Sequence, residues 1–294
     1  MSSYPLLKQI TLIGVGLIGG SFVLDLKRLG LVAKVVGIDL DRANLDRAIE
    51  RGVIDEAHTE ISAASVGGAD LILIATPVAA LTAVCTALKP HLNQRVWISD
   101  VGSTKQSAVA AFAEHLPEHL SRCIATHPIA GSDRHGALAA QFGLFQDKKL
   151  ILTPHGHEHS DGLVLMESLW QAVGAQTFYL SPTEHDGVFA AVSHLPHLLA
   201  FAFVHQLFDH AEGQMYLQFA GSGFRDFTRI AASHPAIWAD ISLANRHGLL
   251  DLIQGFRSQL DVLEQALQQN DRTALYRYFD EARNTRDEWQ QAQE

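Results

Sequence analysis

The stretch ITLIGVGLIGGSFVLDLKRLGLVAKVVGID, residues 10–39, predicts how the first part of the chain folds. A short apolar run is followed at once by GVGLIG at 14–19, and then by apolar residues at helical spacing that end at Gly30. A second apolar run leads into Asp39. A strand, a glycine turn, a helix, a second strand and an acid within about thirty residues form the context that a dinucleotide-binding fingerprint requires.

The three fingerprint glycines have different predicted roles. Gly14 allows the tight turn out of the strand, Gly16 leaves space for a pyrophosphate, and Gly19 lets the helix lie close on the strand. The N-terminus of the helix then offers free N–H groups and a partial positive charge to the phosphates.

Asp39 predicts which dinucleotide binds. It stands where a carboxylate can accept hydrogen bonds from both ribose hydroxyls, and it would repel a 2′-phosphate. We therefore expect NAD as the cofactor rather than NADP. The expected cofactor contacts are Gly14, Gly16, Leu17, Ile18, Gly19, Asp39, Thr76 and Pro77.

The composition indicates a globular protein of one or two domains. The chain has 294 residues, 47% of them hydrophobic and 18% charged, with a net charge of −10. This acidic balance, without a dense Lys/Arg run, argues against nucleic acid or an anionic membrane as a partner. Cys85 and Cys123 stand alone in apolar runs, which is typical of buried thiols in a reducing compartment. We expect a cytoplasmic protein without a signal peptide or a membrane-spanning segment.

Strands and helices alternate up to about residue 180, which predicts an α/β Rossmann-type fold with a doubly wound, mostly parallel sheet. Beyond residue 183 the pattern shows helices only. The domain boundary is therefore predicted near Ser181-Pro182, with a dinucleotide-binding domain over 1–181 and an all-helical dimerisation and substrate domain over 182–294. Further strands are expected at 70–75, 95–99, 122–126, 149–153 and 176–180.

A long amphipathic helix is predicted in the C-terminal part. Its apolar residues recur at alternating spacings of four and three, which forms a seam on one helix face. Packing within its own domain and a dimer interface are both open explanations. The seam consists of Leu249, Ile253, Phe256, Leu260, Leu263 and Leu267.

Two polar side chains come directly after strands of the predicted sheet. Ser103 follows the strand at 95–99, and His127 follows the strand at 122–126. The carboxyl ends of parallel strands face the bound ligand, so both should point toward the nicotinamide. A neutral His can accept the proton of a substrate hydroxyl while hydride leaves the same carbon, and a Ser hydroxyl can orient that His. Each alone could be an ordinary loop residue, but their shared placement favours chemistry.

Histidine pairs elsewhere in the chain raise the question of a metal. In SHLPH at 193–197, His194 and His197 share one helix face, and Pro196 should kink the helix. No third ligand stands at a suitable spacing, so we expect no metal site here. The segment HGHEH at 155–159 matches no closed metal site either, and we interpret it as a polar surface loop.

A glycine-rich segment leads into a charged helix at Arg225, Asp226 and Arg229. The two arginines are four residues apart, so they share a helix face. Arg binds carboxylates through paired hydrogen bonds, which favours an anion site. A surface charge pair is the alternative.

Five motifs occur in order along the chain: GVGLIGGSF at 14–22, DVGSTK at 100–105, HPIAGSDRHG at 127–136, SHLPH at 193–197 and GFRDFTRIA at 223–231. Together they resemble the prephenate and arogenate (cyclohexadienyl) dehydrogenases of tyrosine biosynthesis. The resemblance extends from about residue 10 to at least Trp238. It implies that hydride passes to NAD while the ring carboxylate leaves as carbon dioxide, giving 4-hydroxyphenylpyruvate from prephenate or tyrosine from arogenate.

The resemblance also implies roles for individual residues. His127 would accept the hydrogen bond of the substrate hydroxyl with help from Ser103, and Arg229 would hold a carboxylate. Asp226 would reach into the neighbouring subunit's site, which requires a homodimer, and Trp238 would form an apolar wall. The expected substrate contacts are Arg229, His197, His194, Ser132, Asp133, Arg225, Asp226 and Trp238.

Several points stay open at the level of sequence. Prephenate and arogenate differ only by a keto or amino group, and either Asp133 or Asp186 could favour the ammonium. Inhibition by tyrosine is likewise open. Another two-domain hydroxyacid dehydrogenase would usually place a Lys base in its helical part, but residues 181–294 contain no Lys. A non-catalytic NAD-binding regulator would not need Ser103, His127 and Arg229 together.

Overall fold

The computed structural model describes residues 7–131 and 136–292. The chain forms two compact units, residues 1–246 and residues 247–294. The boundary predicted near Ser181-Pro182 falls inside the first unit, between its last strand and the helix that follows. This division between a dinucleotide domain and a helical domain stays a prediction.

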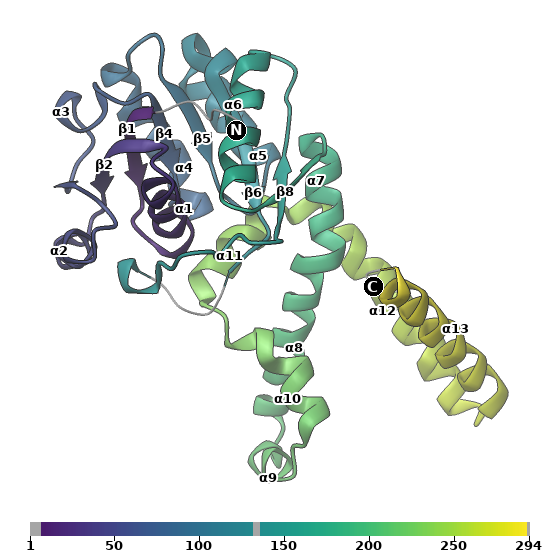
Figure 1. Ribbon diagram of the computed structural model, residues 1–294. Helices are drawn as coiled ribbons and strands as arrows, with labels where there is room; N and C mark the ends of the chain where they lie inside the picture. The colour runs from purple at the N-terminus through teal and green to yellow at the C-terminus, as the bar shows by residue number, and fades with distance from the viewer. Residues whose placement is uncertain (1–6, 132–135, 293–294) are drawn as a thin grey trace. The chain divides into compact units, whose positions relative to one another are not determined.

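The first unit is built on a single eight-stranded sheet with the strand order β3-β2-β1-β4-β5-β6-β7-β8 (Figure 1). Every neighbouring pair is parallel except β6 and β7, which run antiparallel. The strands are β1 (Leu7–Ile13), β2 (Val32–Ile38), β3 (Glu56–His58), β4 (Leu71–Ile74), β5 (Trp97–Asp100), β6 (Cys123–Pro128), β7 (Lys149–Leu152) and β8 (Gln176–Tyr179). The predicted Rossmann-type, mostly parallel sheet is confirmed.

Helices cover both faces of this sheet. On one face, α1 (Leu17–Arg28), α2 (Arg42–Glu50) and α6 (Ser160–Ala172) share an apolar core in which the rings of Phe22 and Trp170 lie 4.2 Å apart. On the other face, α3 (Ala63–Val66), α4 (Leu81–Leu88) and α5 (Gln106–His115) enclose a second core. Cys85 and Cys123 are both buried free thiols in this second core, as predicted. Burial raises the pKa of Cys85 to about 12.

The remainder of the first unit is helical. Among the described residues no strand follows β8, in agreement with the sequence pattern. Pro196 lies inside a continuous helical run, directly after a π-helical turn, and such a turn can accommodate the missing N–H of a proline. The kink predicted at Pro196 stays a prediction. The elements are α7 (Pro182–Phe189), the π turn (Ala190–His194), α8 (Leu195–Asp209), α9 (Gly213–Gln218), α10 (Ser222–Thr228), a 3-10 turn (Arg229–Ala232) and α11 (Pro235–Ala244).

One helical run in this part differs from the sequence-based expectation. Pro182–Asp209 spans 28 residues with a mean hydropathy of 1.7 in its most apolar window, so its length and composition would permit a membrane crossing. From the sequence we expected no segment long and apolar enough to span a membrane. Core helices of soluble proteins also have this length and composition, so the run alone is weak evidence for a membrane.

The second unit is a helical hairpin of α12 (Arg246–Gln268) and α13 (Arg272–Gln291). Asp271 caps α13 by accepting a hydrogen bond from the N–H of Ala274. The predicted apolar seam lies on α12. Leu249 is buried, whereas Leu260 and Leu267 are 49% and 66% exposed, so the hairpin alone does not cover the seam.

Candidate active site

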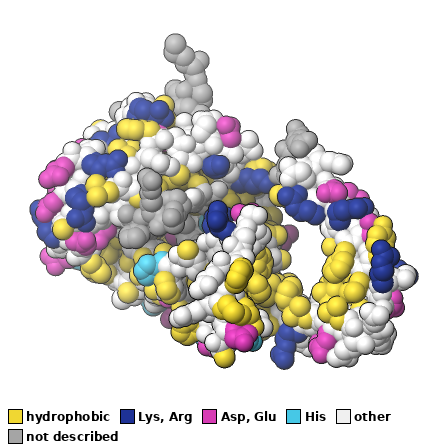
Figure 2. Space-filling view, turned by 90° about the horizontal axis from the view of Figure 1, so that it is seen from below, with side chains coloured by type: hydrophobic (Ala, Val, Ile, Leu, Met, Phe, Trp, Pro, Cys, Tyr) yellow, Lys and Arg dark blue, Asp and Glu magenta, His cyan; other side chains and the backbone are white. Residues whose placement is uncertain are grey.

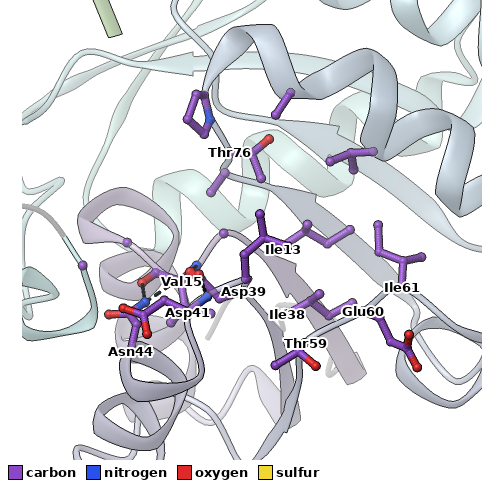
Figure 3. A pocket seen from close by; sticks show the side chains of 18 of the residues that line it. Ile13, Val15, Ile38, Asp39, Asp41, Asn44, Thr59, Glu60, Ile61 and Thr76 are labelled. Carbon is purple, nitrogen blue, oxygen red and sulfur yellow. Dashed lines mark hydrogen bonds between the residues drawn. The ribbon is translucent and has the colours of Figure 1, made fainter. Parts of the chain in front are cut away.

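A cavity of about 1140 Å³ lies at the carboxyl ends of β1, β2 and β4 (Figure 3). The strand order reverses between β1 and β4, and open α/β sheets bind their ligands at this point. Five of the predicted cofactor contacts line the cavity: Gly14, Gly16, Asp39, Thr76 and Pro77. The cavity is large enough for most of a dinucleotide.

The three fingerprint glycines have the surroundings that their predicted roles require. Gly14 has φ of +88°, and a Cβ there would lie 2.6 Å from the carbonyl oxygen of Ala75. A Cβ at Gly19 would lie 2.4 Å from Cδ1 of Leu12, which reflects close packing of α1 on β1. At Gly16, by contrast, nothing described lies within 4 Å of such a Cβ, so the space beside it is open.

Leu17 and Ile18 do not line the cavity with their side chains, and Leu17 is buried in the core. They form the first turn of α1. The N–H of Gly20 donates to the carbonyl of Gly16 (2.9 Å), and the N–H groups of the first turn precede this bond in the chain. Any contact of Leu17, Ile18 or Gly19 with a phosphate would therefore use the backbone N–H.

The carboxylate of Asp39 is held in place by three donors. Its Oδ2 accepts from the N–H of Val15 (3.0 Å) and from Nδ2 of Asn44 (3.1 Å), and its Oδ1 accepts from the N–H of Asp41 (3.0 Å). Figure 3 shows Val15, Asp39 and Asn44 close together at the cavity. Asp41, Glu60 and Arg47 also line this cavity, and Arg47 is 3.5 Å from the carboxylate of Asp41. Three carboxylates against one guanidinium suit a ribose better than a 2′-phosphate.

Asn44 was not predicted from the sequence. Besides Asp39, it contacts the segment that follows β6, because its Oδ1 accepts a hydrogen bond from the N–H of Ala137 (2.8 Å). Arg51 holds the same segment by donating to the carbonyls of Ala137, Leu138 and Ala140. These contacts join α2 to residues distant in the chain, and no local motif reveals them.

His127 lies at the carboxyl end of β6 and belongs to a chain of hydrogen bonds. Its Nδ1 is 2.8 Å from Nε2 of His185, and Nδ1 of His185 is 2.8 Å from Oδ1 of Asp186. The N–H groups of Lys105 (2.7 Å) and Gln106 (3.0 Å) donate to the two oxygens of that carboxylate. The sequence left Asp186 as a possible partner for a substrate ammonium. The structure instead buries it with both oxygens bonded inside the protein.

The histidines in this chain of hydrogen bonds favour the neutral form. Burial, followed by nearby His185 and Lys105, holds the pKa of His127 well below 6.5. Burial also lowers the pKa of His185, although Asp186 opposes this shift. Burial alone would raise the pKa of Asp186, but the hydrogen bonds from His185 and the two backbone N–H groups keep it below its usual value. A neutral His127 can accept a proton.

Lys105 is fully buried beside this network. Its Nζ donates to Oδ2 of Asp100 (2.5 Å) and to the carbonyl of Thr126 (2.6 Å), which links the carboxyl ends of β5 and β6. Burial lowers the pKa of Lys105, and the charge of Asp100 opposes that shift. This Lys belongs to the DVGSTK motif, but its burial depends on tertiary contacts that the motif does not reveal.

Ser103 lies in the loop between β5 and α5 and is partly buried. Within the part of the chain that the structure describes, its hydroxyl makes no hydrogen bond to His127. The assistance that Ser103 would give to His127 stays a prediction.

Four predicted substrate contacts lie near one another in the helical part. The ring of His197 stacks on Trp238 at 3.5 Å, and the ring of His194 lies 6.1 Å from the same Trp. Burial lowers the pKa of His194 to about 4. Burial also lowers the pKa of His197, and the positive charge of Arg229 lowers it further. The guanidinium of Arg229 is therefore close enough to His197 to affect its protonation.

The remaining predicted substrate contacts are Arg225, Asp226, Ser132 and Asp133. Arg225 and Asp226 are exposed on α10. Ser132 and Asp133 lie outside the described residues. Among the residues that are described, no three His, Cys, Asp or Glu side chains form a group that could hold a metal ion.

The fold and the cavity are those of a nicotinamide-dependent dehydrogenase of the Rossmann type, followed by a helical part. Two family models match the chain: "Prephenate dehydrogenase, nucleotide-binding domain" over residues 22–179 and "Prephenate dehydrogenase, dimerization domain" over residues 181–281. The chain belongs to the prephenate dehydrogenase family, and the resemblance inferred from the five motifs is confirmed.

Individual relatives agree with this assignment. The chain is 37% identical to prephenate dehydrogenase of Bacillus subtilis, over 95% of this chain and 75% of the relative. It is 33% identical to cyclohexadienyl dehydrogenase of Zymomonas mobilis, over 95% of both. Prephenate dehydrogenase from Aquifex aeolicus, solved with hydroxyphenyl propionate and NAD+, superposes with a TM-score of 0.88 at 34% identity, covering 96% of this chain and 98% of that one.

Proposed function

We propose that this chain catalyses the oxidative decarboxylation of prephenate, arogenate or both, with hydride transfer to NAD. The observation that carries the proposal is the position of His127 on the same edge of the sheet as the dinucleotide cavity, bonded to His185, in a member of the prephenate dehydrogenase family. Burial holds the pKa of His127 well below 6.5, which favours the neutral form. The Aquifex aeolicus relative was solved with NAD+ and a hydroxyphenyl acid, which supports the same pair of ligands here.

The chemistry divides between the cofactor and the side chains. Bound NAD would accept the hydride from the carbinol carbon of the substrate. Nε2 of His127 would accept the hydroxyl proton as that carbon becomes a carbonyl. The ring carboxylate would leave as carbon dioxide, the electron pair of the broken bond would pass into the ring, and the carbonyl oxygen would take a proton back from His127 as it becomes the phenol hydroxyl. Because the ring becomes aromatic, the protein mainly has to orient it and polarise the hydroxyl.

Substrate binding would fall to the helical part. Arg229 would pair with a carboxylate through its guanidinium, as charge-assisted hydrogen bonds to carboxylates are strong. Trp238 and His197, which stack on each other, would form a wall beside the ring. Ser103 would bond the substrate oxygen, and Ser132, Asp133, His194 and Arg225 stay predicted contacts.

A homodimer fits this function. The matched dimerisation model covers residues 181–281, and that region exposes large apolar side chains (Figure 2). Phe208 and Phe219 are 82% and 83% exposed in the single chain, which favours a partner surface. Asp226 would then reach the neighbouring subunit's site. We place the enzyme in the cytoplasm, in accord with its two free thiols.

The test of the proposal is direct. Purified protein is mixed with NAD and either prephenate or arogenate, and NADH absorbance is followed with time. We expect NADH to form with at least one substrate, and the ratio of the two kcat/KM values identifies the preferred one. Binding of NAD without turnover of either substrate would instead identify a non-catalytic NAD-binding protein.

A further inference from the structure

The strongest unassigned feature is the pair His185 and Asp186, which begins the helical part and reaches back to the sheet. His185 is fully buried and Asp186 is 1% exposed. Both lie on α7. The carboxylate of Asp186 bonds the N–H groups of Lys105 and Gln106, which stand 81 and 80 residues earlier in the chain. Asp186 thus caps the N-terminus of α5 across the fold.

The hydrogen positions in this network follow from counting donors. Oδ1 of Asp186 accepts from the N–H of Lys105, and Oδ2 accepts from the N–H and the side-chain amide of Gln106 (3.3 Å). A carboxyl group surrounded by three donors is ionised, so it accepts from His185 as well. Nδ1 of His185 therefore carries the hydrogen.

The tautomer of His127 follows from that of His185. Burial lowers the pKa of His185 and so favours its neutral form. A neutral His185 with its hydrogen on Nδ1 has a free lone pair on Nε2. The 2.8 Å contact to His127 then requires that Nδ1 of His127 be the donor. Nε2 of His127 is left as an acceptor.

We propose that Asp186 and His185 are positioning residues that hold His127 in the tautomer whose Nε2 accepts the hydroxyl proton of the substrate. A buried carboxylate that orients an imidazole through Nδ1 is a known device of acid–base catalysis, and here a second imidazole is interposed. When His127 takes up the proton, its Nδ1–H stays bonded to His185, which stabilises the imidazolium. The kinetic part of this inference rests on the proposed function, whereas the tautomer itself does not.

The first test is made on the unliganded wild-type protein. Long-range ¹H–¹⁵N correlation spectra of the imidazoles distinguish a protonated from a bare ring nitrogen, and the spectrum of His127→Gln identifies the His127 signals among the 16 histidines. We expect Nδ1 of His127 to be protonated and Nε2 to be bare. A His127 protonated on Nε2 overturns the proposal, whether or not the protein turns over prephenate.

The second test compares two substitutions at the same position. His185→Phe keeps an aromatic ring at this position but loses the hydrogen bonds to His127 and Asp186. We expect kcat to fall about 10²-fold and the KM for NAD to stay unchanged. His185→Gln can still accept from His127 and donate to Asp186, so we expect it to retain kcat within about tenfold. Equal losses in both variants, with the His127 tautomer unchanged, would mean that His185 acts only in packing.

His155→Phe is the matched control. The interpretation of residues 155–159 as a surface loop is wrong for His155 and Glu158, whose side chains are nearly buried and lie 3.1 Å apart. His155 also bonds the carbonyl of Cys123, at the opposite end of β6, through its Nε2. We expect this variant to lose stability like His185→Phe but to keep the wild-type His127 tautomer and kcat. A loss of kcat in His155→Phe equal to that in His185→Phe would remove the distinction on which the proposal depends.

Discussion

The cofactor cavity and the His127 network lie on the same edge of the sheet but are assembled differently. The cavity takes Gly14, Gly16 and Asp39 from a single stretch of chain. The network joins His127 to a residue 58 positions away. Its hydrogen bonds either join two side chains or run from backbone N–H groups at the start of α5 to the carboxylate of Asp186. A bound dinucleotide can therefore be inferred from a local pattern, whereas the protonation state of a catalytic histidine depends on tertiary contacts.

The largest effect should come from the network. His127→Asn removes the acceptor, and since proton transfer by a positioned side chain contributes about 10²–10⁴-fold, kcat should fall by that order. The Kd for NAD should stay near the wild-type value, because His127 is not among the cavity residues. Steady-state kinetics and a fluorescence titration with NAD measure the two quantities. Unchanged turnover would contradict the mechanism.

A smaller effect is expected at the helical side of the site. Arg229→Ala should raise the KM for prephenate about 10–100-fold, the effect of losing a charge-assisted hydrogen bond, and leave the KM for NAD nearly unchanged. Arg225→Ala is the matched comparison four residues earlier, and its effect should be smaller because only Arg229 acts on the pKa of His197. Equal changes in both KM values would show that Arg229 is structural.

The smallest effect should come from the cavity. Asp39→Ser removes the carboxylate that disfavours a 2′-phosphate, so the ratio of kcat/KM for NAD to that for NADP should fall about tenfold, or ~1.4 kcal/mol. Asp46→Asn, on the exposed side of α2 and outside the cavity, should leave this ratio unchanged. A wild-type enzyme that already prefers NADP would overturn the assignment of Asp39.

These two regions also mark how far the sequence could be interpreted. The Rossmann sheet and the open space at Gly16 follow from local patterns of apolar residues and glycines. The sequence missed β3, whose three residues, Glu-Ala-His, carry no strand pattern. It did not foresee that β7 pairs antiparallel with β6, because strand direction is set by the path of the connection.

The sequence predicted some residues of the site but not the contacts between them. Strand ends predicted the place of His127, but not its partners His185 and Asp186, since neither belongs to a local motif. Asp186 appeared to be free for a substrate ammonium, and the structure shows that the N-terminus of α5 and His185 occupy its carboxylate. Buried polar partners of this kind are specified by packing between distant segments, which a single sequence does not show.

The central claim is that a neutral His127 beside the NAD cavity accepts the hydroxyl proton. The pH dependence of kcat/KM for prephenate tests it most directly. Protonation of His127 removes the acceptor, and its pKa is held well below 6.5, so activity should fall on the acid side with a midpoint below that value. The acid limb should be absent from the residual activity of His127→Asn. Activity that rises as the pH falls, or an identical acid limb in His127→Asn, would contradict the account.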